Sequence, residues 1–457
     1  MRSRLPDDVA PSLQPASAAA RGGTRRHPDR RALLAGTAAG ALAAGAAALW
    51  WPRSDAGALP GLRGWPGDPD WSAVADQERA WVAAGRVPGV GGAFEAMSRQ
   101  ALVDLRRLLQ RNGSGEFPET FIAGPAGAWR YSWPRDGAFA AAAFARTGHL
   151  REAVSILAWL RAVQDRSDDG GFEARYDSTG RAPDSRHAQA DGAGWAAWAV
   201  AEVLTAPGSP FQRPADLDDP GLTPAPLSPL LRRTSVYLLR QTENGARLPS
   251  PSSDYWERRE RRLTLGTAAV ILLGLRHAAL VHDHLGMAAA ARGLHRAAAR
   301  QEDVVHAAFA PSGYQRYAES DGDGDGTGPC ASTCFLLPPF TTAARPGVLA
   351  AWRTYQRDAA RPAGGLAPGV GWKDDGISWT PEVSLVASTA AACGRHARAQ
   401  HWLSWLDAHR AAGGSISEKV LPDGSPAGPA PLGWSAANVL LALDHLDDRW
   451  GPSGSPR

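Results

Sequence analysis

The stretch LREAVSILAWLRAV, residues 150–163, gives the clearest indication of the fold. Its apolar residues recur at i, i+3, i+4 and i+7, counted from Leu150 to Leu157, so a helix would collect them on one face. The pattern predicts an amphipathic helix over residues 149–165. The preceding segment, 135–147, is also helical in character, and the join between the two is very short. We therefore predict a helical hairpin.

The same kind of pattern continues along most of the chain, whereas alternating β-type runs are nearly absent. The chain is therefore predicted to be all-α. Segment 331–342 is the weakest of the expected helices, because Pro338 and Pro339 interrupt it. The expected helices form six pairs: 90–111, 135–147, 149–165, 190–205, 227–243, 264–281, 285–310, 331–342, 346–358, 381–394, 396–411 and 432–448.

Long loops rich in Trp, Asp, Arg, Gly and Pro recur before every second helix of this series. Such a period indicates a repeated helix-pair unit. If every second helix lines an inner ring, all the long loops gather at one end of that ring. The N-terminal ends of the inner helices would then surround one ligand pocket.

The net charge of +3 belongs to the N-terminal end of the chain. Residues 1–31 carry seven Arg against three Asp, which is +4, so the remaining residues sum to −1. A nearly neutral body has no basic face for nucleic acid, and we expect no such partner.

The uncharged segment 32–51 directly follows Arg30 and Arg31. An arginine pair before a weakly apolar stretch is typical of a twin-arginine export signal. Left uncleaved, this stretch is long enough to span a bilayer. We expect an exported protein, secreted or anchored on the outer face of the cytoplasmic membrane, that meets a membrane only through this segment.

The expected organisation has four parts. Residues 1–51 form the basic arm with its signal or anchor, and 52–89 form a connector with one short helix. The helical domain covers 90–450, and 451–457 form a disordered tail.

We expect neither a metal nor a cofactor. The three cysteines, Cys330, Cys334 and Cys393, make no disulfide framework, although the first two could form a bridge or stay as buried thiols. Three aspartates at alternate positions could bind calcium, but an EF-hand needs Glu at the twelfth position, where Ser332 stands. A Gly/Asp loop without calcium is the favoured interpretation of Asp321, Asp323 and Asp325.

Two loop glutamates are candidates for acid–base chemistry. Glu257 follows Trp256, and apolar surroundings keep a carboxyl group protonated, as a general acid requires. Glu418 lies in a polar loop before the last helix, where it could activate a water while Trp434 stacks on a sugar ring. Each glutamate taken alone is more often a solvated surface residue. Their placement in loops that one architecture brings together is what pairs them.

A third loop, Trp129 to Asp136, carries three aromatic residues before an Arg-Asp pair. Arg135 and Asp136 could grip adjacent sugar hydroxyls, with Asp accepting and Arg donating hydrogen bonds. The alternative is an ion pair that caps a helix, since Asp is favourable at a helix N-terminus in any case.

These motifs together resemble those of glycoside hydrolase family 15, the glucoamylase-type enzymes with their glucodextranase and bacterial trehalase relatives. Tyr131 to Asp136 is similar to the family motif YxWxRD, and Trp256-Glu257 to its acid loop. Ser417-Glu418, followed by Pro431 to Ser435, resembles its base loop. Gln189 and Asp191 resemble the bacterial Gln-x-Asp before an inner helix. The resemblance covers residues 95–448 in the family's motif order.

The resemblance implies an (α/α)6 barrel and inverting, exo-acting hydrolysis of an α-linked oligosaccharide or disaccharide. It implies that Glu257 is the general acid and Glu418 the general base, with their carboxyl groups about 6.5–9.5 Å apart. It also implies that Arg135 and Asp136 hold the non-reducing sugar. The implied substrate-binding aromatic residues are Trp129, Tyr131, Trp133, Trp256 and Trp434, beside Gln189 and Asp191.

Two departures from the family pattern argue against starch as the substrate. Arg258 stands where many fungal members have a second Glu, and residues 52–90 are too few for the β-sandwich of bacterial relatives. A catalytically silent carbohydrate-binding or cell-envelope protein on the same barrel is the main alternative function. A phosphorylase is a further alternative, but it needs no base such as Glu418, and export argues against it.

Overall fold

Helices that are apolar on every side must be covered on every side, and this requirement sorts the helices of the chain into two sets. The computed structural model describes residues 76–111, 119–318 and 327–449. Four helices are buried along most of their length, namely α4 (Pro134–Arg146), α6 (Asp191–Leu204), α8 (Leu265–His284) and α11 (Thr380–Ala392). Others bury one face, including α7 (Ser228–Gln241), α9 (Ala288–Phe309) and α12 (His396–Ala408).

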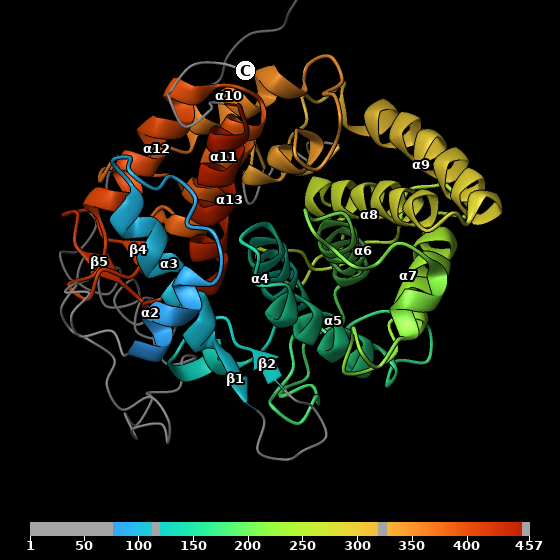
Figure 1. The fold of residues 1–457 in the computed structure, drawn as a ribbon. Coiled ribbons are helices and arrows are strands. Elements are labelled where there is room, and N and C mark those ends of the chain that lie inside the picture. The colour runs from blue at the N-terminus through green and yellow to red at the C-terminus, as the bar shows by residue number, and fades with distance from the viewer. Residues whose placement is uncertain (1–75, 112–118, 319–326, 450–457) are drawn as a thin grey trace, which may run out of the picture. The chain divides into compact units, whose positions relative to one another are not determined.

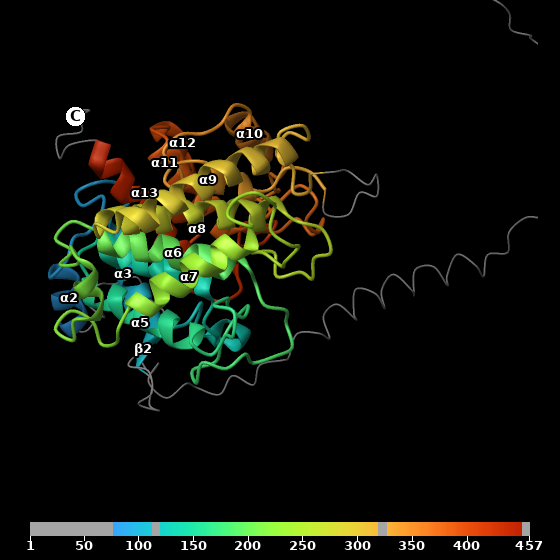
Figure 2. The same ribbon diagram turned by 90° about the vertical axis from the view of Figure 1, so that its right-hand side faces the viewer.

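The buried helices form a closed inner ring. In ring order, α4 contacts α6, α6 contacts α8, α8 contacts the 3₁₀ helix η4 (Ala331–Leu336), η4 contacts α11, α11 contacts α13 (Gly433–Arg449), and α13 returns to α4. Outer helices pack against them, so the chain passes once around a double ring (Figure 1). Figure 2 shows the outer helices α7 and α9 in front of α6 and α8.

Further helices and two small sheets complete the described part of the fold. The remaining helices are α2 (Asp76–Ala83), α3 (Glu95–Leu108), α5 (Leu150–Gln164), α10 (Val348–Asp358), η2 (Gly127–Arg130) and η3 (Pro214–Asp218). Strands β1 (Leu109–Arg111) and β2 (Glu119–Phe121) pair antiparallel, with Leu109 opposite Phe121. A second antiparallel sheet has the order β3 (Ser378–Trp379), β4 (Lys419–Val420) and β5 (Pro426–Ala427).

The predicted all-α fold and the predicted inner ring are confirmed, with two corrections. Segment 331–342 is helical only over η4, because the two prolines at 338 and 339 cannot continue a helix. The end of segment 90–111 is a strand, since residues 109–111 pair with β2 instead of extending α3. The expected short helix of the connector is α2.

The short hairpin joins depend on glycine. Gly148, between α4 and α5, has φ of 83°, and Gly394, between α11 and α12, has φ of 69°. These left-handed conformations end one helix without the steric cost that a side chain would add. The outer helix can then return at once along the inner one.

Glycine also permits a close approach inside the ring. A Cβ atom added at Gly274 of α8 would lie 2.6 Å from the Cα atom of Gly194 in α6. It would also lie 3.0 Å from the side chain of Leu238 in α7. The two inner helices and one outer helix therefore meet where glycine leaves room.

Among the described residues, α8 is the one helix long and apolar enough to span a membrane. It is an inner helix of the barrel, and 89% of its apolar window is buried in the protein. The cysteines Cys330, Cys334 and Cys393 are all free thiols, so the bridge that we considered does not form. Predictions for 1–51, for Asp321, Asp323 and Asp325, and for 451–457 lie outside the described residues.

We predict that Gly274→Ala destabilises the barrel by about 1–3 kcal/mol, because the added methyl group overpacks the contact between α6 and α8. The control is Gly293→Ala in α9, where an added Cβ atom meets nothing within 4 Å. That variant should be neutral or gain up to about 1 kcal/mol from helix propensity. Chemical unfolding of both variants measures the difference, and equal effects would contradict the close contact.

Candidate active site

The loops that precede the inner helices meet at one end of the ring and bring the predicted residues together. Arg135 and Asp136 lie in the first turn of α4, and Asp191 begins α6. Glu257 lies in the loop before α8, and Glu418 lies between α12 and α13, next to β4. Contacts between these loops, described below, join segments that are far apart in the sequence.

Glu257 is surrounded by hydrogen-bond donors from the first turn of α4 and from the loop before α6. Arg135 Nη1 donates to its Oε1 atom at 3.2 Å, while Arg186 Nη1 and Gln189 Nε2 donate to Oε2 at 3.1 and 3.0 Å. The side chain remains 23% exposed. Its surroundings are therefore more polar than the apolar environment that Trp256 led us to expect. Both carboxylate oxygens are oriented, and one edge of the group can still be reached.

The backbone at Glu257 adopts an unusual conformation, with φ of 55°. A non-glycine residue in this left-handed region is uncommon and needs support from its surroundings. Asp254 provides it: its carbonyl oxygen accepts from Glu257 N at 2.8 Å, and its Oδ1 atom accepts from Trp256 N at 3.0 Å. This turn presents the Glu257 side chain to Arg135.

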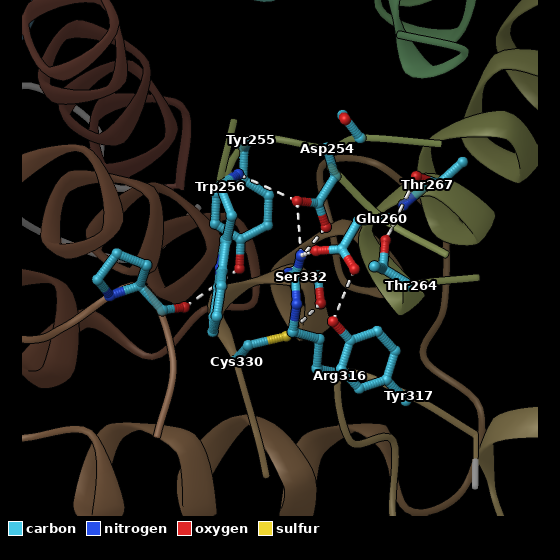
Figure 3. Close-up of polar contacts among 12 residues, drawn as sticks. Asp254, Tyr255, Trp256, Glu260, Thr264, Thr267, Arg316, Tyr317, Cys330 and Ser332 are labelled. Atoms are coloured by element: carbon cyan, nitrogen blue, oxygen red, sulfur yellow. Dashed lines mark hydrogen bonds and ion pairs between the residues drawn. The ribbon is translucent and has the colours of Figure 1, made fainter. Parts of the chain in front are cut away.

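A buried arginine in turn holds the Asp254 turn (Figure 3). Arg316 donates to both carboxylate oxygens of Asp254, at 2.8 and 2.9 Å, and to Glu260 at 2.7 Å. Its guanidinium also lies over the Trp256 ring, 3.8 Å from the ring centroid. Since the Arg316 side chain is fully buried, the two carboxylates and the ring replace the water that it loses. One residue therefore fixes both sides of the loop that carries Glu257.

Arg135 lies at the centre of the predicted site. It donates to Asp136 Oδ2 at 3.0 Å as well as to Glu257, and its guanidinium lies over Trp434, 4.5 Å from the ring centroid. Burial raises the pKa of the Asp136 carboxyl, while Arg135 opposes the rise. The Arg-Asp pair therefore does more than cap α4, because it also binds a residue of the loop before α8.

Glu418 is more buried than Glu257, with its side chain 9% exposed. The indole nitrogen of Trp129 donates to Oε1 at 3.1 Å, and Lys419 Nζ lies 3.1 Å from Oε2. Burial raises the pKa of Glu418, whereas Lys419 and Trp129 lower it and nearby Asp136 adds to the rise. The aromatic loop and the second glutamate are thus in contact through Trp129.

The loop of Glu418 is fixed through its backbone. Thr380 N donates to the Glu418 carbonyl at 3.0 Å, and the Thr380 and Ser435 hydroxyls are 2.8 Å apart. The Ser415 hydroxyl donates to buried Asp104 at 2.9 Å. Burial raises the pKa of Asp104 to about 7. These contacts tie the loop to α3, α11 and α13.

Two further buried carboxyl groups, those of Glu382 and Asp191, lie near the two glutamates of the site. Burial raises the pKa of Glu382, in the first turn of α11, to about 8, and nearby Glu418 contributes to the rise. Burial also raises the pKa of Asp191 to about 7, with a contribution from Glu257. Arg135 lowers both pKa values. The Arg135 guanidinium therefore interacts electrostatically with carboxyl groups from four different segments, and its positive charge opposes the effect of their burial.

The rings of Tyr131, Trp133 and Trp256 pack against other residues around the site. The guanidinium of Arg175 lies over Tyr131 and Trp133, 4.8 and 5.2 Å from the ring centroids. Trp256 is buried, and beside Arg316 it contacts Trp372 edge-on at 5.0 Å between centroids. The structure thus places these rings next to the site, where they support its loops.

Sequence patterns did not identify Arg186, Lys419, Glu382 or Arg316. Lys419 directly follows Glu418, so the sequence alone could have suggested that its charge acts on Glu418. Arg316 lies 62 residues from its partner Asp254, and no local pattern connects them. Among the described residues, no group of three His, Cys, Asp or Glu side chains could hold a metal ion.

The fold is similar to that of solved glycosidases and glucoamylases. A protein described as a wild-type glycosidase matches with a TM-score of 0.62 and 21% identity, over 77% of this chain and 96% of that chain. The glucoamylase of Saccharomycopsis fibuligera has a TM-score of 0.62 and 15% identity, over 77% and 95%. The family 15 glucoamylase of Hypocrea jecorina has a TM-score of 0.60 and 15% identity, over 83% and 74%.

At these identities the similarity establishes the fold, which is the (α/α)6 barrel expected from the sequence. No family model and no curated protein matches the chain.

We predict that Arg316→Gln destabilises the protein by about 3–5 kcal/mol, because it leaves Asp254 buried without its cationic partner. The double variant Arg316→Gln with Asp254→Asn should recover part of this loss, since position 254 then carries no unpaired charge, although Glu260 still lacks its Arg316 partner. Chemical unfolding of the single and double variants gives the coupling energy. Strictly additive effects would show that the two residues do not support the loop as a pair.

Proposed function

We propose that this protein is an exported glycoside hydrolase of the glucoamylase type, acting on α-glucosides with inversion. The observation that carries this proposal is the position of Arg135, which binds Glu257 and Asp136 while Asp136 also acts electrostatically on Glu418. Two glutamates from separate loops thus share one binding centre. The barrel similarity to glycosidases and glucoamylases supports the same reaction class.

Sugar binding is assigned to Arg135 and Asp136. Arg135 can donate hydrogen bonds to a sugar hydroxyl, and the Asp136 carboxylate can accept one from its neighbour. Both groups are mostly buried, so the surrounding protein fixes their orientation. A glutamate-to-alanine variant of a glycosidase with this fold was solved in complex with glucose, which is consistent with a sugar at such a site. A bacterial glucoamylase of this fold was solved with acarbose.

The two glutamates then divide the acid and base roles. Glu257, partly exposed and oriented by Gln189, would donate a proton to the departing oxygen. Glu418, held by Trp129, would accept a proton from a water that attacks the opposite side of the sugar. Inversion requires space for this water, hence a separation of about 6.5–9.5 Å between the two carboxyl groups. The aglycone leaves beside the exposed edge of Glu257.

We predict that Glu257→Gln and Glu418→Gln each lower kcat by about 10²–10⁴-fold, the usual contribution of general acid–base groups. The full-length protein is incubated with maltose, isomaltose, trehalose, maltodextrin and dextran, and proton NMR follows the product anomers. The first product should be the β-anomer. Glu243→Gln, which changes an exposed ion pair after α7, is the matched control and should retain full activity.

An initial α-anomer in this experiment would exclude inversion. No turnover of any sugar, together with unchanged sugar affinity in both glutamine variants, would favour the catalytically silent carbohydrate-binding protein instead.

A second prediction concerns the pH dependence. A base must be ionised, and burial raises the pKa of Glu418 while Lys419 lowers it. The acid limb of kcat/KM should therefore lie at higher pH than an exposed glutamate would give. Lys419→Met should move that limb to still higher pH, because the opposing cation is lost. Lys373→Met, at an exposed position, should leave the limb unchanged, and a shift to lower pH would contradict the assignment.

A further inference from the structure

A second cavity, separate from the contacts of Glu257, lies between helix α7 and the loops before α6 and α8. Its volume is about 380 Å³, within the range of roughly 300–1,000 Å³ that small-molecule sites occupy. We call it the α7 cavity. The residues that contact Glu257, namely Arg135, Arg186 and Gln189, are not among those that line it. The residues that matter for its chemistry are His187, Tyr237, Gln241, Ser253, Arg259 and Glu260.

The α7 cavity contains polar groups without a protein partner. Tyr237 is 7% exposed, and within the described part of the chain its hydroxyl makes no hydrogen bond. Burial raises the pKa of this hydroxyl, so it stays protonated and can both donate and accept. The hydroxyl oxygen is not among the fully buried side-chain atoms that lack a partner, so it remains open to the cavity that Tyr237 lines. A ligand in the cavity can therefore reach it.

The other lining groups indicate which kind of ligand fits. Gln241, Ser253 and Arg259 also line the cavity. The first two are half-buried and Arg259 is exposed, so all three side chains can reach a ligand. Hydroxyl, amide and guanidinium groups together match adjacent hydroxyls, which donate and accept in turn.

The charges of the lining favour a neutral ligand. Arg259 is positive, but Glu260 in the same wall is negative, and Arg316 and Tyr317 already bind its two oxygens. Glu260 is therefore not available for a cation, and its charge offsets the attraction of an anion to Arg259.

We propose that the α7 cavity is a second carbohydrate-binding site, which takes a neutral sugar unit. Its wall belongs to the same loop as Glu257, since Ser253 precedes Asp254 and Arg259 follows two residues after Glu257. The Ser252 hydroxyl also accepts from Ala190 N at 3.0 Å, which joins this wall to the loop of Gln189. A sugar bound here lies beside the candidate active site without occupying its carboxylates.

The test uses maltose as the probe and the Glu257→Gln, Glu418→Gln double variant of the full chain as the background, so that maltose is not consumed. A ligand-observed NMR titration should show two binding components. Adding Tyr237→Phe and Gln241→Ala should weaken one component by roughly three- to thirtyfold, the effect of losing one or two neutral hydrogen bonds. The other component should keep its affinity.

Arg240→Ala is the matched control, because this exposed residue of α7 does not line the cavity. It should change neither component. Maltose binding that the cavity substitutions leave unchanged in every component, whether one component is seen or two, would overturn the proposal. Tighter binding of glucose 6-phosphate than of glucose to the cavity component would overturn the neutral ligand class.

Thermal unfolding shows whether the cavity variants are folded. If the combined variant unfolds, Tyr237→Phe alone repeats the test, because it keeps the ring and removes only the hydroxyl. This experiment measures binding and not turnover. If the proposed hydrolase activity fails, the binding result for the α7 cavity still stands by itself.

Discussion

The closed inner ring is the constraint on which the rest of the structure depends. Its helices are apolar on nearly every side, so each must have neighbours on every side, and only closure of the ring provides them. Small residues make closure possible, as Gly194 and Gly274 show where α6 and α8 meet. Because the inner helices are joined through outer helices that run back, their N-terminal ends gather at one end of the ring. The candidate site is a consequence of that topology.

Charge at the site is organised in the same way, around buried arginines. Arg135 binds Glu257 and Asp136 and lies over Trp434, whereas Arg316 binds Asp254 behind the same loop. Buried charges persist only with partners, since the cost of desolvation is large. The two arginines therefore make the positions of several loops interdependent. A loop that carries a left-handed residue such as Glu257 needs support of this kind.

Local sequence patterns predicted a helix correctly where contacts between residues close in the chain determine it. Amphipathic periodicity identified α5, and the very short join before it predicted the hairpin with α4. The same reasoning was wrong over 331–342, because apolar composition outweighed the two prolines, and only η4 is helical there. It was also wrong at residues 109–111, where pairing with β2 replaced the last turn of the expected helix. In both places a non-local contact or a backbone restriction overrode the periodicity.

The sequence by itself determined the all-α class, the pairing of helices, and the loops that hold Glu257, Glu418, Arg135 and Asp136. Periodicity and short motifs contain this information, because they depend on residues close together in the chain. Only the tertiary structure decided that two arginines contact Glu257, that Lys419 and Trp129 flank Glu418, and that Arg316 holds the loop from behind. These contacts join segments up to 289 residues apart. Burial and electrostatics depend on such distant neighbours, and no local pattern encodes them.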